Sequence, residues 1–361
     1  MIVPAKYAML LRRIYFWPAN LSYGAILHAR HALYNSGLFK STRPAVPTIA
    51  VGNLALGGTG KTPMLELVLR VLEGVRPIAT LSRGYGRKST DIHEVQATDS
   101  AAHSGDEPVQ VKRNFPAARV FVGVDRVKAV DLIQQQVPGV RAVVLDDALQ
   151  HRALDAGLKI LLTTAQRPYC DDALLPAGTL RDVRSRAKAA QLVVVTKCVE
   201  TPTAAEQREW RQRLGLHQEQ HLFFASMAYG EPRWMDGTEV PAFPGQETSA
   251  LVFTGIVQPE PFVMHVRSLC GHVEHIAFPD HHAFTTPELQ RLADVFGSFA
   301  AGPKMLITTE KDAARLRSVI AGSPLEGLPL ATIGVRTIIL NEPEHFADLI
   351  IRHVGTHQAH R

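Results

Sequence analysis

A glycine-rich segment that ends in lysine and threonine is the most chemically specific feature of the sequence. Residues 57–62 read GGTGKT and lie between the apolar run 47–51 and a helical pattern of apolar residues over 65–72. A strand, a glycine-rich turn and a helix form a cradle for nucleotide phosphates, because backbone N–H groups and the positive end of the helix converge on the anion. The expected contacts are Gly57, Gly58, Thr59, Gly60, the Lys61 ammonium on the β/γ-phosphates and the Thr62 hydroxyl on Mg²⁺.

The segment departs from the strict phosphate-loop pattern G-x-x-x-x-G-K-[ST] at one position. Ala55 stands where the first glycine of the pattern belongs. Gly57 and Gly58 can supply the missing backbone freedom, because glycine reaches conformations that other residues avoid. The flanking strand and helix patterns therefore still predict a nucleoside triphosphate site.

Two adjacent acids end another apolar strand pattern. Residues 142–145 are followed directly by Asp146 and Asp147. A carboxylate at the carboxyl end of a strand beside a phosphate loop is placed to hold Mg²⁺, so both acids are candidate metal-side residues. Gln150 and His151 follow within about one helical turn, and they are candidates to fix a metal-bound water or the nucleotide.

Two further polar positions could serve phosphoryl chemistry. Arg83 follows the apolar run 77–81, where a guanidinium could clamp a phosphate. Asp106 lies between Gly105 and the sequence Glu107-Pro108, which is typical of a helix start. It could cap that helix, or it could accept the proton of an attacking hydroxyl. The sequence leaves both roles open.

Short apolar strand patterns alternate with helical stretches along most of the chain. Such alternation predicts an α/β fold with a doubly wound, mostly parallel sheet that carries the phosphate loop, and a second, smaller α/β domain. The strand patterns are 47–51, 77–81, 119–122, 142–145, 159–162, 192–195, 251–255 and 305–308. The expected organisation is an amino-terminal segment 1–46, a phosphate-loop domain 47–221, a linker 222–248 and a second α/β domain 249–361 that closes a cleft.

The amino-acid composition indicates which classes of protein the chain can belong to. The 361 residues are 46% hydrophobic and 20% charged, which is ordinary for a globular chain of about two domains. The three cysteines lack C-x-x-C spacing, so they predict buried thiols in a reducing compartment instead of a disulfide framework or zinc site. The first 65 residues carry basic residues and no acids, interleaved with aromatic residues of the kind found at membranes, and this argues against a nucleic-acid partner.

The amino-terminal 46 residues resemble a surface-docking segment. No Asp or Glu precedes Glu66, and the uncharged run 14–27 is too short to span a bilayer. On a helical wheel an apolar face forms beside basic and aromatic residues, as in a helix that lies in a membrane surface. That face contains Leu21, Ala25, Ile26, Ala29, Ala32 and Leu33. The alternative is that the helix packs on the core of its own domain.

Taken together, these segments resemble the tetraacyldisaccharide 4'-kinase family, also called lipid A 4'-kinases. The matching residues cover most of 47–315 in order. They are 51–53 with 57–63, 82–86, 104–108, Asp146-Asp147 with Gln150-His151, 175–178 with 180–181, Asp280-His281 and 309–312. The resemblance implies transfer of the γ-phosphate of ATP, with Mg²⁺, to the 4'-hydroxyl of a tetraacylated glucosamine disaccharide 1-phosphate, which gives lipid IVA.

The same resemblance implies roles for individual residues. Asp106 is similar to the general base, His281 to a histidine partner that reaches it from the second domain, and Lys61 to the catalytic phosphate contact. Asp182 stands where the family usually has glutamate, and as a carboxylate it is a further metal candidate. The implied location is peripheral, on the cytoplasmic face of the inner membrane. The lipid and that membrane surface are the implied partners, and no oligomer is implied.

Two other classes of protein compete with a lipid kinase. A GTP-dependent switch or metallochaperone could use a similar nucleotide fold, but guanine readers typically carry Asn/Thr-Lys-x-Asp, and residues 196–199 read TKCV without the aspartate. A peripheral membrane ATPase or scaffold would hydrolyse the nucleotide without labelling lipid. Competition between ATP and GTP, and phosphate release without lipid labelling, separate these alternatives.

Overall fold

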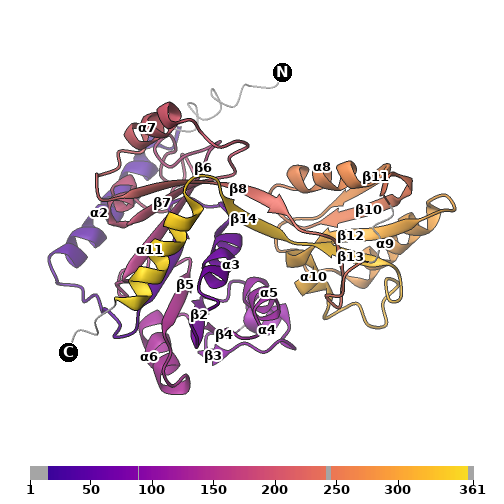
Figure 1. Cartoon of the computed structure of the whole chain (residues 1–361), viewed down its shortest axis with the longest axis horizontal. Helices are drawn as coiled ribbons and strands as arrows, with labels where there is room; N and C mark the ends of the chain where they lie inside the picture. Colours follow the sequence, from indigo (N-terminus) through magenta and orange to yellow (C-terminus); the bar gives the residue numbers. More distant parts are fainter. Residues whose placement is uncertain (1–14, 88, 241–244, 357–361) are drawn as a thin grey trace. The chain divides into compact units, whose positions relative to one another are not determined.

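The computed structural model describes residues 15–87, 89–240 and 245–356, and these residues form two compact units (Figure 1). The first unit contains residues up to Arg83, residues 117–227 and residues from Thr337 onward. The second contains residues 84–116 and 228–336. Each unit is described by itself below. Lys6, Arg12 and Arg13 of the predicted docking segment lie outside the described residues.

A mostly parallel sheet forms the centre of the first unit. Within the first unit its strands follow the order β14-β8-β7-β6-β1-β5-β2-β4. Their bounds are β1 (Thr48–Asn53), β2 (Ile78–Ser82), β4 (Arg119–Val122), β5 (Ala142–Asp146), β6 (Leu158–Thr164), β7 (Leu192–Thr196), β8 (His221–Tyr229) and β14 (Val335–Ile339). The apolar runs of the sequence become these strands because residues such as Ile49, Val144 and Val194 are fully buried in the sheet.

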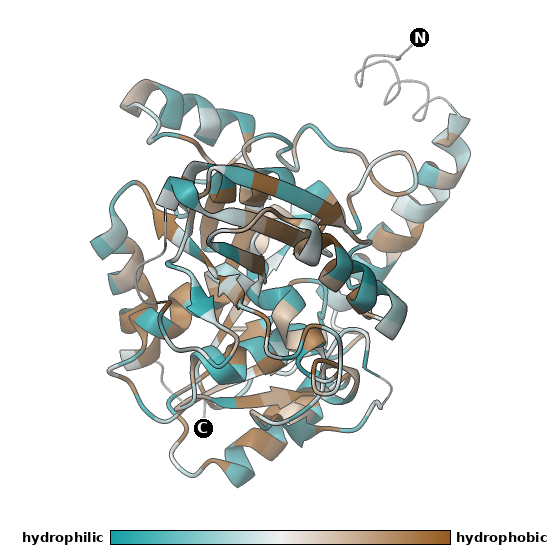
Figure 2. Cartoon of the chain, turned by 90° about the vertical axis from the view of Figure 1, so that its right-hand side faces the viewer, coloured by the Kyte–Doolittle hydropathy of each residue, from teal (hydrophilic) through white to brown (hydrophobic). Residues whose placement is uncertain are grey.

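Helices connect and flank these strands. They are α2 (Trp17–Asn35), α3 (Lys61–Val71), α6 (Arg126–Gln136), the 3₁₀ helix η1 (Arg184–Ala189), α7 (Ala204–Arg213) and α11 (Pro343–Gly355). Met64, Leu65 and Val68 of α3 are buried, and α11 contacts α3 along the same unit. Figure 2 shows teal and brown residues mixed along the helices, as expected when one face of a helix packs on a core.

Helix α2 has an apolar face that it does not bury. Its buried residues are Gly24, Leu27 and His31. Leu21 and Ile26, from the face predicted for docking, are each 65% exposed. Ala25, Ala29 and Ala32 of that face are also exposed, and Leu33 is half-buried. The helix therefore buries only a narrow seam, and the side chains of Asn20, Tyr23 and Arg30 add hydrogen bonds to backbone carbonyls of the same unit.

The second unit is built on a smaller sheet in the order β11-β10-β12-β13-β9. Its strands are β9 (Arg233–Trp234), β10 (Ser249–Thr254), β11 (His272–Ala277), β12 (Lys304–Thr309) and β13 (Leu330–Ile333), and a short strand β3 (His93–Glu94) also belongs to this unit. Its helices are α4 (Ala101–Ser104), α5 (Asp106–Asn114), the 3₁₀ helix η2 (Gly245–Glu247), α8 (Glu260–Leu269), α9 (Thr286–Ser298) and α10 (Glu310–Leu316).

Helices cover both faces of this second sheet. Leu251 and Phe253 of β10 pack in one core cluster with Leu292 of α9. Their strand neighbours Ala250 and Val252 pack in another cluster with α8. Successive residues of a strand point to opposite faces, so the middle of β10 needs apolar residues at consecutive positions, and residues 250–253 supply them. The predicted α/β class, with a mostly parallel sheet and a smaller second α/β part, is confirmed.

The boundaries of the compact units differ from those expected from the sequence. Residues 84–116 group with the second unit, although they precede most strands of the first. Residues from 337 onward return to the first unit. The expected linker 222–248 begins as strand β8, which pairs in parallel with β7, because Phe223 and Phe224 are buried there. Residues 241–244 of that linker lie outside the described residues.

No helix in the described part of the chain has the length and apolarity needed to cross a bilayer.

We expect Phe253→Ala to lower the free energy of unfolding of the second unit by about 3–5 kcal/mol, because the ring is fully buried and its removal leaves a cavity. Urea unfolding followed by far-UV circular dichroism measures the change. Val257→Ala, at a position that is 56% exposed in the same unit, is the matched control and should stay within about 0.5 kcal/mol of wild type. Equal effects of the two substitutions would contradict the described core.

Candidate functional site

The predicted phosphate loop connects β1 to α3 and has the backbone of an anion cradle. Gly57 has φ +108° and Gly60 has φ +87°, conformations that favour glycine. Gly60 is the N-cap of α3, no side chain caps that helix, and its first turn holds no acid. The N–H groups at this end are therefore available to an anion.

Two buried side chains form hydrogen bonds to Thr59 of the phosphate loop. Asn53 Nδ2 donates to Thr59 Oγ1 at 2.7 Å. The Thr196 hydroxyl, at the end of β7, donates to the Thr59 carbonyl at 2.9 Å. A Cβ placed at Gly57 or Gly58 would meet no atom within 4 Å, so this side of the loop faces open space. The loop is therefore fixed at its base and open where a phosphate would lie.

Lys61 and the acid pair lie at the same edge of the sheet. β1 and β5 pair in parallel with Val51 opposite Asp146, so the loop and the acids follow neighbouring strand ends. Lys61 Nζ lies 4.0 Å from Asp147 Oδ1. Arg181 makes a bidentate contact with the Asp147 carboxylate and also donates to Asn53 Oδ1 at 2.7 Å. One network thus joins Lys61, Asp147, Arg181 and Asn53.

The Asp147 carboxylate is held in its charged form. Burial alone would raise its pKa, but the hydrogen bond from Arg181 and the positive charges of Lys61 and Arg181 outweigh burial and lower the pKa below its ordinary value. Asp147 also has φ +48°, which is uncommon for a residue with a side chain. The bidentate arginine contact fixes a carboxylate on this strained backbone, as is common at functional sites.

The other predicted residues of this unit surround that network. The Asp146 carbonyl accepts a hydrogen bond from the buried Arg126 guanidinium at 2.7 Å. Gln150 Nε2 donates to the Asn53 carbonyl at 2.6 Å. His151 is half-buried, and burial lowers its pKa. Arg83 is exposed directly after β2, whose residue Leu81 lies opposite Leu145 of β5. All four therefore belong to the carboxyl edge of one parallel sheet.

Asp182 has a different environment from the acid pair. It is buried, and its Oδ1 lies 2.6 Å from Nε2 of His31, a residue of α2. The same oxygen accepts the Val183 backbone N–H at 2.8 Å. In the described part of the chain, Asp182 does not form a ligand group with Asp146 and Asp147. The carboxylate that was a metal candidate is instead directed to the amino-terminal helix.

The residues of the first unit suit a magnesium–nucleoside triphosphate. The open glycine loop supplies N–H donors, and Lys61 supplies a positive charge beside them. Thr62 is the second residue of α3, and Asp147 is a charged carboxylate close to Lys61. Hydroxyl and carboxylate oxygens are ligands that Mg²⁺ prefers, and a magnesium ion bound there would neutralise charge on the phosphates.

A second group of functional side chains lies wholly within the second unit. Asp106 is the first residue of α5 and is only 5% exposed. Its Oδ2 lies 2.9 Å from His281 Nδ1 and 3.0 Å from Arg315 Nε. His281 Nε2 in turn lies 3.2 Å from Lys311 Nζ, and the Tyr85 ring packs on the imidazole at 5.2 Å between centroids.

The side chains around Asp106 keep its carboxylate ionised. Burial would raise its pKa, but the His281 hydrogen bond and the charges of Lys311 and Arg315 outweigh burial and lower the pKa to about 2. Oδ1 accepts the Glu107 backbone N–H at 3.0 Å. A carboxylate oxygen can accept more than one hydrogen bond, so Oδ1 can also receive a substrate hydroxyl.

Two sequence-based interpretations of Asp106 differ from the structure. Gly105, not Asp106, is the N-cap of α5, so the capping alternative does not describe this carboxylate. His281 was expected to reach Asp106 from another domain, but both residues belong to the same compact unit. The reason is that segment 84–116 packs with residues 228–336, with many contacts between α5 and α10.

Sequence reasoning missed Arg315, which shares the buried Asp106 oxygen with His281. Its Nη1 also bonds Asp312 and the Gly255 carbonyl. Lys311 lies in the segment 309–312, which was recognised without a role. Lys311 and Arg315 are four residues apart on α10 and therefore share one helix face, a spacing that could have indicated a paired cationic surface.

The low pKa of Asp106 predicts an acid-sensitive stability. The folded-state pKa of about 2 lies below the ordinary 3.8, so the ionised carboxylate stabilises the fold above pH 4 by about 2 kcal/mol, and this contribution is lost as pH falls from 4 to 2. Urea unfolding at successive pH values should show a steeper loss between pH 4.5 and 3 for wild type than for Asp106→Asn, which cannot titrate. Parallel pH dependences would contradict the ion pairing described.

Known proteins resemble this chain over most of its length. The sequence model of the family described as "Tetraacyldisaccharide-1-P 4'-kinase" matches residues 12–354. A tetraacyldisaccharide 4'-kinase of Flavobacterium johnsoniae is 36% identical over 96% of this chain and 98% of its own length. One of Parabacteroides distasonis is 35% identical over 94% of each chain.

A solved structure has the same fold. It is described as the "apo" form of LpxK from Aquifex aeolicus in complex with ATP, and it matches with a TM-score of 0.73 at 26% identity, over 95% of this chain and 99% of that one. This confirms the predicted phosphate-loop kinase fold. On the family match and the identities of these relatives, the chain belongs to the tetraacyldisaccharide-1-P 4'-kinase family.

Proposed function

We propose that this chain transfers the γ-phosphate of ATP to the 4'-hydroxyl of a tetraacylated glucosamine disaccharide 1-phosphate and forms lipid IVA in lipid A biosynthesis. The observation that carries the proposal is the open glycine loop with Lys61 and the charged Asp147, in a chain that matches the kinase family over residues 12–354. The ATP named with the Aquifex aeolicus structure supports ATP as the donor.

The donor is bound by the first unit. Residues 57–60 and the N-terminus of α3 donate N–H groups to the phosphates, and Lys61 neutralises charge on the group being transferred. Thr62, Asp146 and Asp147 hold Mg²⁺, and Arg83, Gln150 and His151 contact the nucleotide or its waters. Arg181 keeps Asp147 charged and oriented. Asp182 serves a different purpose here: with His31 it fixes α2 to the unit.

Asp106 serves the acceptor hydroxyl. The hydroxyl oxygen forms a bond to the γ-phosphorus, the bond between that phosphorus and the ADP oxygen breaks, and the hydroxyl proton passes to Asp106. A carboxylate with a pKa of about 2 is a weak base, so the proton moves late, when the new P–O bond has made the hydroxyl acidic. His281, Arg315 and Lys311 orient the carboxylate and hold its charge until then.

Helix α2 docks the enzyme where its acylated substrate lies. Its exposed apolar face, with Leu21 and Ile26, fits the interfacial region of a lipid bilayer. Trp17 and Tyr15 at its start are exposed aromatic residues of the kind that favour that interface. We therefore place the protein as a peripheral enzyme on the cytoplasmic face of the inner membrane, with the membrane surface as a partner.

Incubation of the purified chain with γ-labelled ATP and the acylated disaccharide 1-phosphate tests the proposal. Label should appear in a lipid product that thin-layer chromatography resolves, and GTP should compete poorly. Phosphate release without labelled lipid would instead indicate an ATPase, and preferential competition by GTP would indicate a GTP-dependent switch.

We expect Asp106→Asn to lower kcat by about 10²–10⁴-fold while changing the KM for ATP little, because it removes a proton acceptor and leaves the phosphate loop intact. Steady-state kinetics with labelled ATP measure both constants. Lys61→Ala is the contrasting variant and should weaken ATP binding itself. An unchanged kcat in Asp106→Asn would remove Asp106 from the reaction.

The docking role of α2 predicts weaker vesicle binding in the double variant Leu21→Glu, Ile26→Glu, because charges replace the apolar residues that would enter the interface. Cosedimentation with vesicles that contain anionic phospholipid should show at least a several-fold loss. Val199→Glu, at a 90% exposed apolar position elsewhere in the unit, is the matched control and should bind as wild type does. Equal binding by all three proteins would contradict docking through this face.

A further inference from the structure

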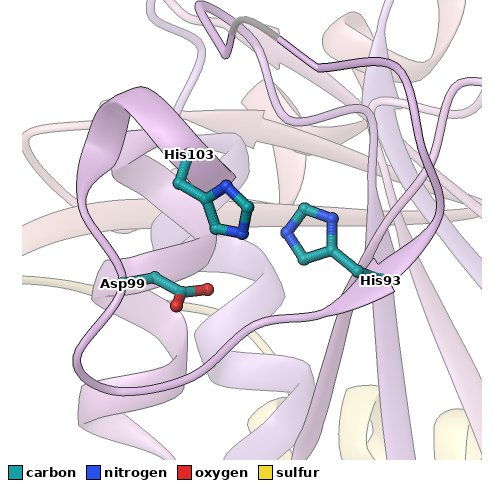
Figure 3. Close-up of side chains that lie close together, drawn as sticks. All are labelled: His93, Asp99 and His103. Carbon is teal, nitrogen blue, oxygen red and sulfur yellow. The ribbon is translucent and has the colours of Figure 1, made fainter.

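Two histidines and an aspartate converge just before the Asp106 helix, in a place that the proposed reaction does not use. One possible ligand atom each from His93, Asp99 and His103 lies within 4.8 Å of the others. Figure 3 shows the two imidazoles next to one another and the Asp99 carboxylate directed toward them. The rings are stacked at 4.6 Å between centroids with 23° between their planes.

The hydrogen bonds around His93 leave one hydroxyl between two possible acceptors when the imidazole is neutral. His93 Nδ1 lies 3.1 Å from Asp91 Oδ2, and an N–H there makes Nε2 an acceptor in the neutral ring. Nε2 lies 3.0 Å from the Ser104 hydroxyl, and that hydroxyl is also 2.6 Å from Asp99 Oδ2. One hydroxyl proton therefore faces two acceptors. A cation among these atoms would satisfy both.

The contact with Asp91 has the form that protein metal sites use. A histidine ligand usually donates its other ring N–H to a carboxylate, which orients the ring and makes the ligating nitrogen more basic. Asp91 stands in that position toward His93. Asp99 is itself positioned by the Gln96 backbone N–H, which donates to its Oδ2 at 3.0 Å. The outer contacts of a metal site are thus present together with the three ligand atoms.

We propose that His93, Asp99 and His103 bind a divalent transition-metal ion of the zinc class, with water completing the coordination. Two imidazoles and one carboxylate favour zinc over magnesium, which prefers oxygen ligands. In a tetrahedral zinc site the ligand atoms are about 3.3 Å apart, so closing the group needs small side-chain movements. His103 is exposed and can make them. All three residues lie within 93–103, so little loop-closure entropy opposes binding.

An ion bound at this site would restrain the segment of chain that leads to Asp106. His103 lies in α4, and only Ser104 and Gly105 separate it from Asp106. Gly105 has φ +93° and makes the turn into α5. An ion that joins β3, the turn at Asp99 and α4 would therefore restrain the segment that leads to Asp106, and we expect bound zinc to raise the melting temperature of the full chain.

Titration of the metal-free full-length protein with Zn²⁺ by calorimetry, and with Co²⁺ by visible absorption, tests the site. One equivalent should bind, and the Co²⁺ form should show the intense visible bands of four- or five-coordinate cobalt. His103→Ala and Asp99→Asn should each weaken Zn²⁺ binding by at least about 10-fold, and Asp91→Asn should weaken it by about 10–100-fold through His93.

The matched control is His217→Ala, which removes another exposed histidine and should leave Zn²⁺ affinity and the cobalt spectrum unchanged. Circular dichroism of each variant separates loss of binding from loss of fold. The proposal is overturned if Co²⁺ gives only the weak spectrum of six-coordinate cobalt, or if His103→Ala binds Zn²⁺ as wild type does. Because binding is read without ATP or lipid, this outcome is independent of the proposed kinase activity.

Discussion

Ion pairing of carboxylates that are shielded from water is the constraint on which both groups of functional residues depend. A charged group taken out of water is costly unless it is paired and hydrogen-bonded. Asp106 is paired with His281 and Arg315, Asp147 with Arg181 and Lys61, and Asp182 with His31. In each case the partner side chain comes from a different segment of the chain, so satisfying the carboxylate also fixes the fold locally.

The two groups use this constraint differently. In the first unit the acids stand at the carboxyl edge of a parallel sheet, beside Lys61 and Arg181, and the glycine loop at the same edge faces open space at Gly57 and Gly58. In the second unit the Asp106 carboxylate is more deeply buried and is surrounded by cations on α10 and by His281. The first arrangement suits binding of an anion. The second suits holding one carboxylate ready for a hydroxyl.

Helix α2 shows that an apolar face need not be a core face. Gly24, Leu27 and His31 are the buried residues of the helix, and Asp182 pairs with His31, so a polar contact lies within the small seam that attaches the helix. Leu21 and Ile26 remain in solvent as a result. The carboxylate expected at a metal thus serves to anchor the helix that is proposed to meet the membrane.

The sequence by itself determined the phosphate loop, the strand pattern, the acid pair and the family. These features are local: glycine conformations, apolar runs and a lysine at a helix start depend on neighbours a few residues away. The candidate residues Lys61, Asp147, Asp106 and His281 could therefore be named in advance. Only the tertiary structure decided that segment 84–116 belongs with residues 228–336, that Arg315 shares the Asp106 oxygen and that Asp182 faces His31. The Arg315 and His31 pairings join residues 209 and 151 positions apart. Sequence reasoning cannot find them, because a buried carboxylate can be satisfied by any donor that the fold brings near it.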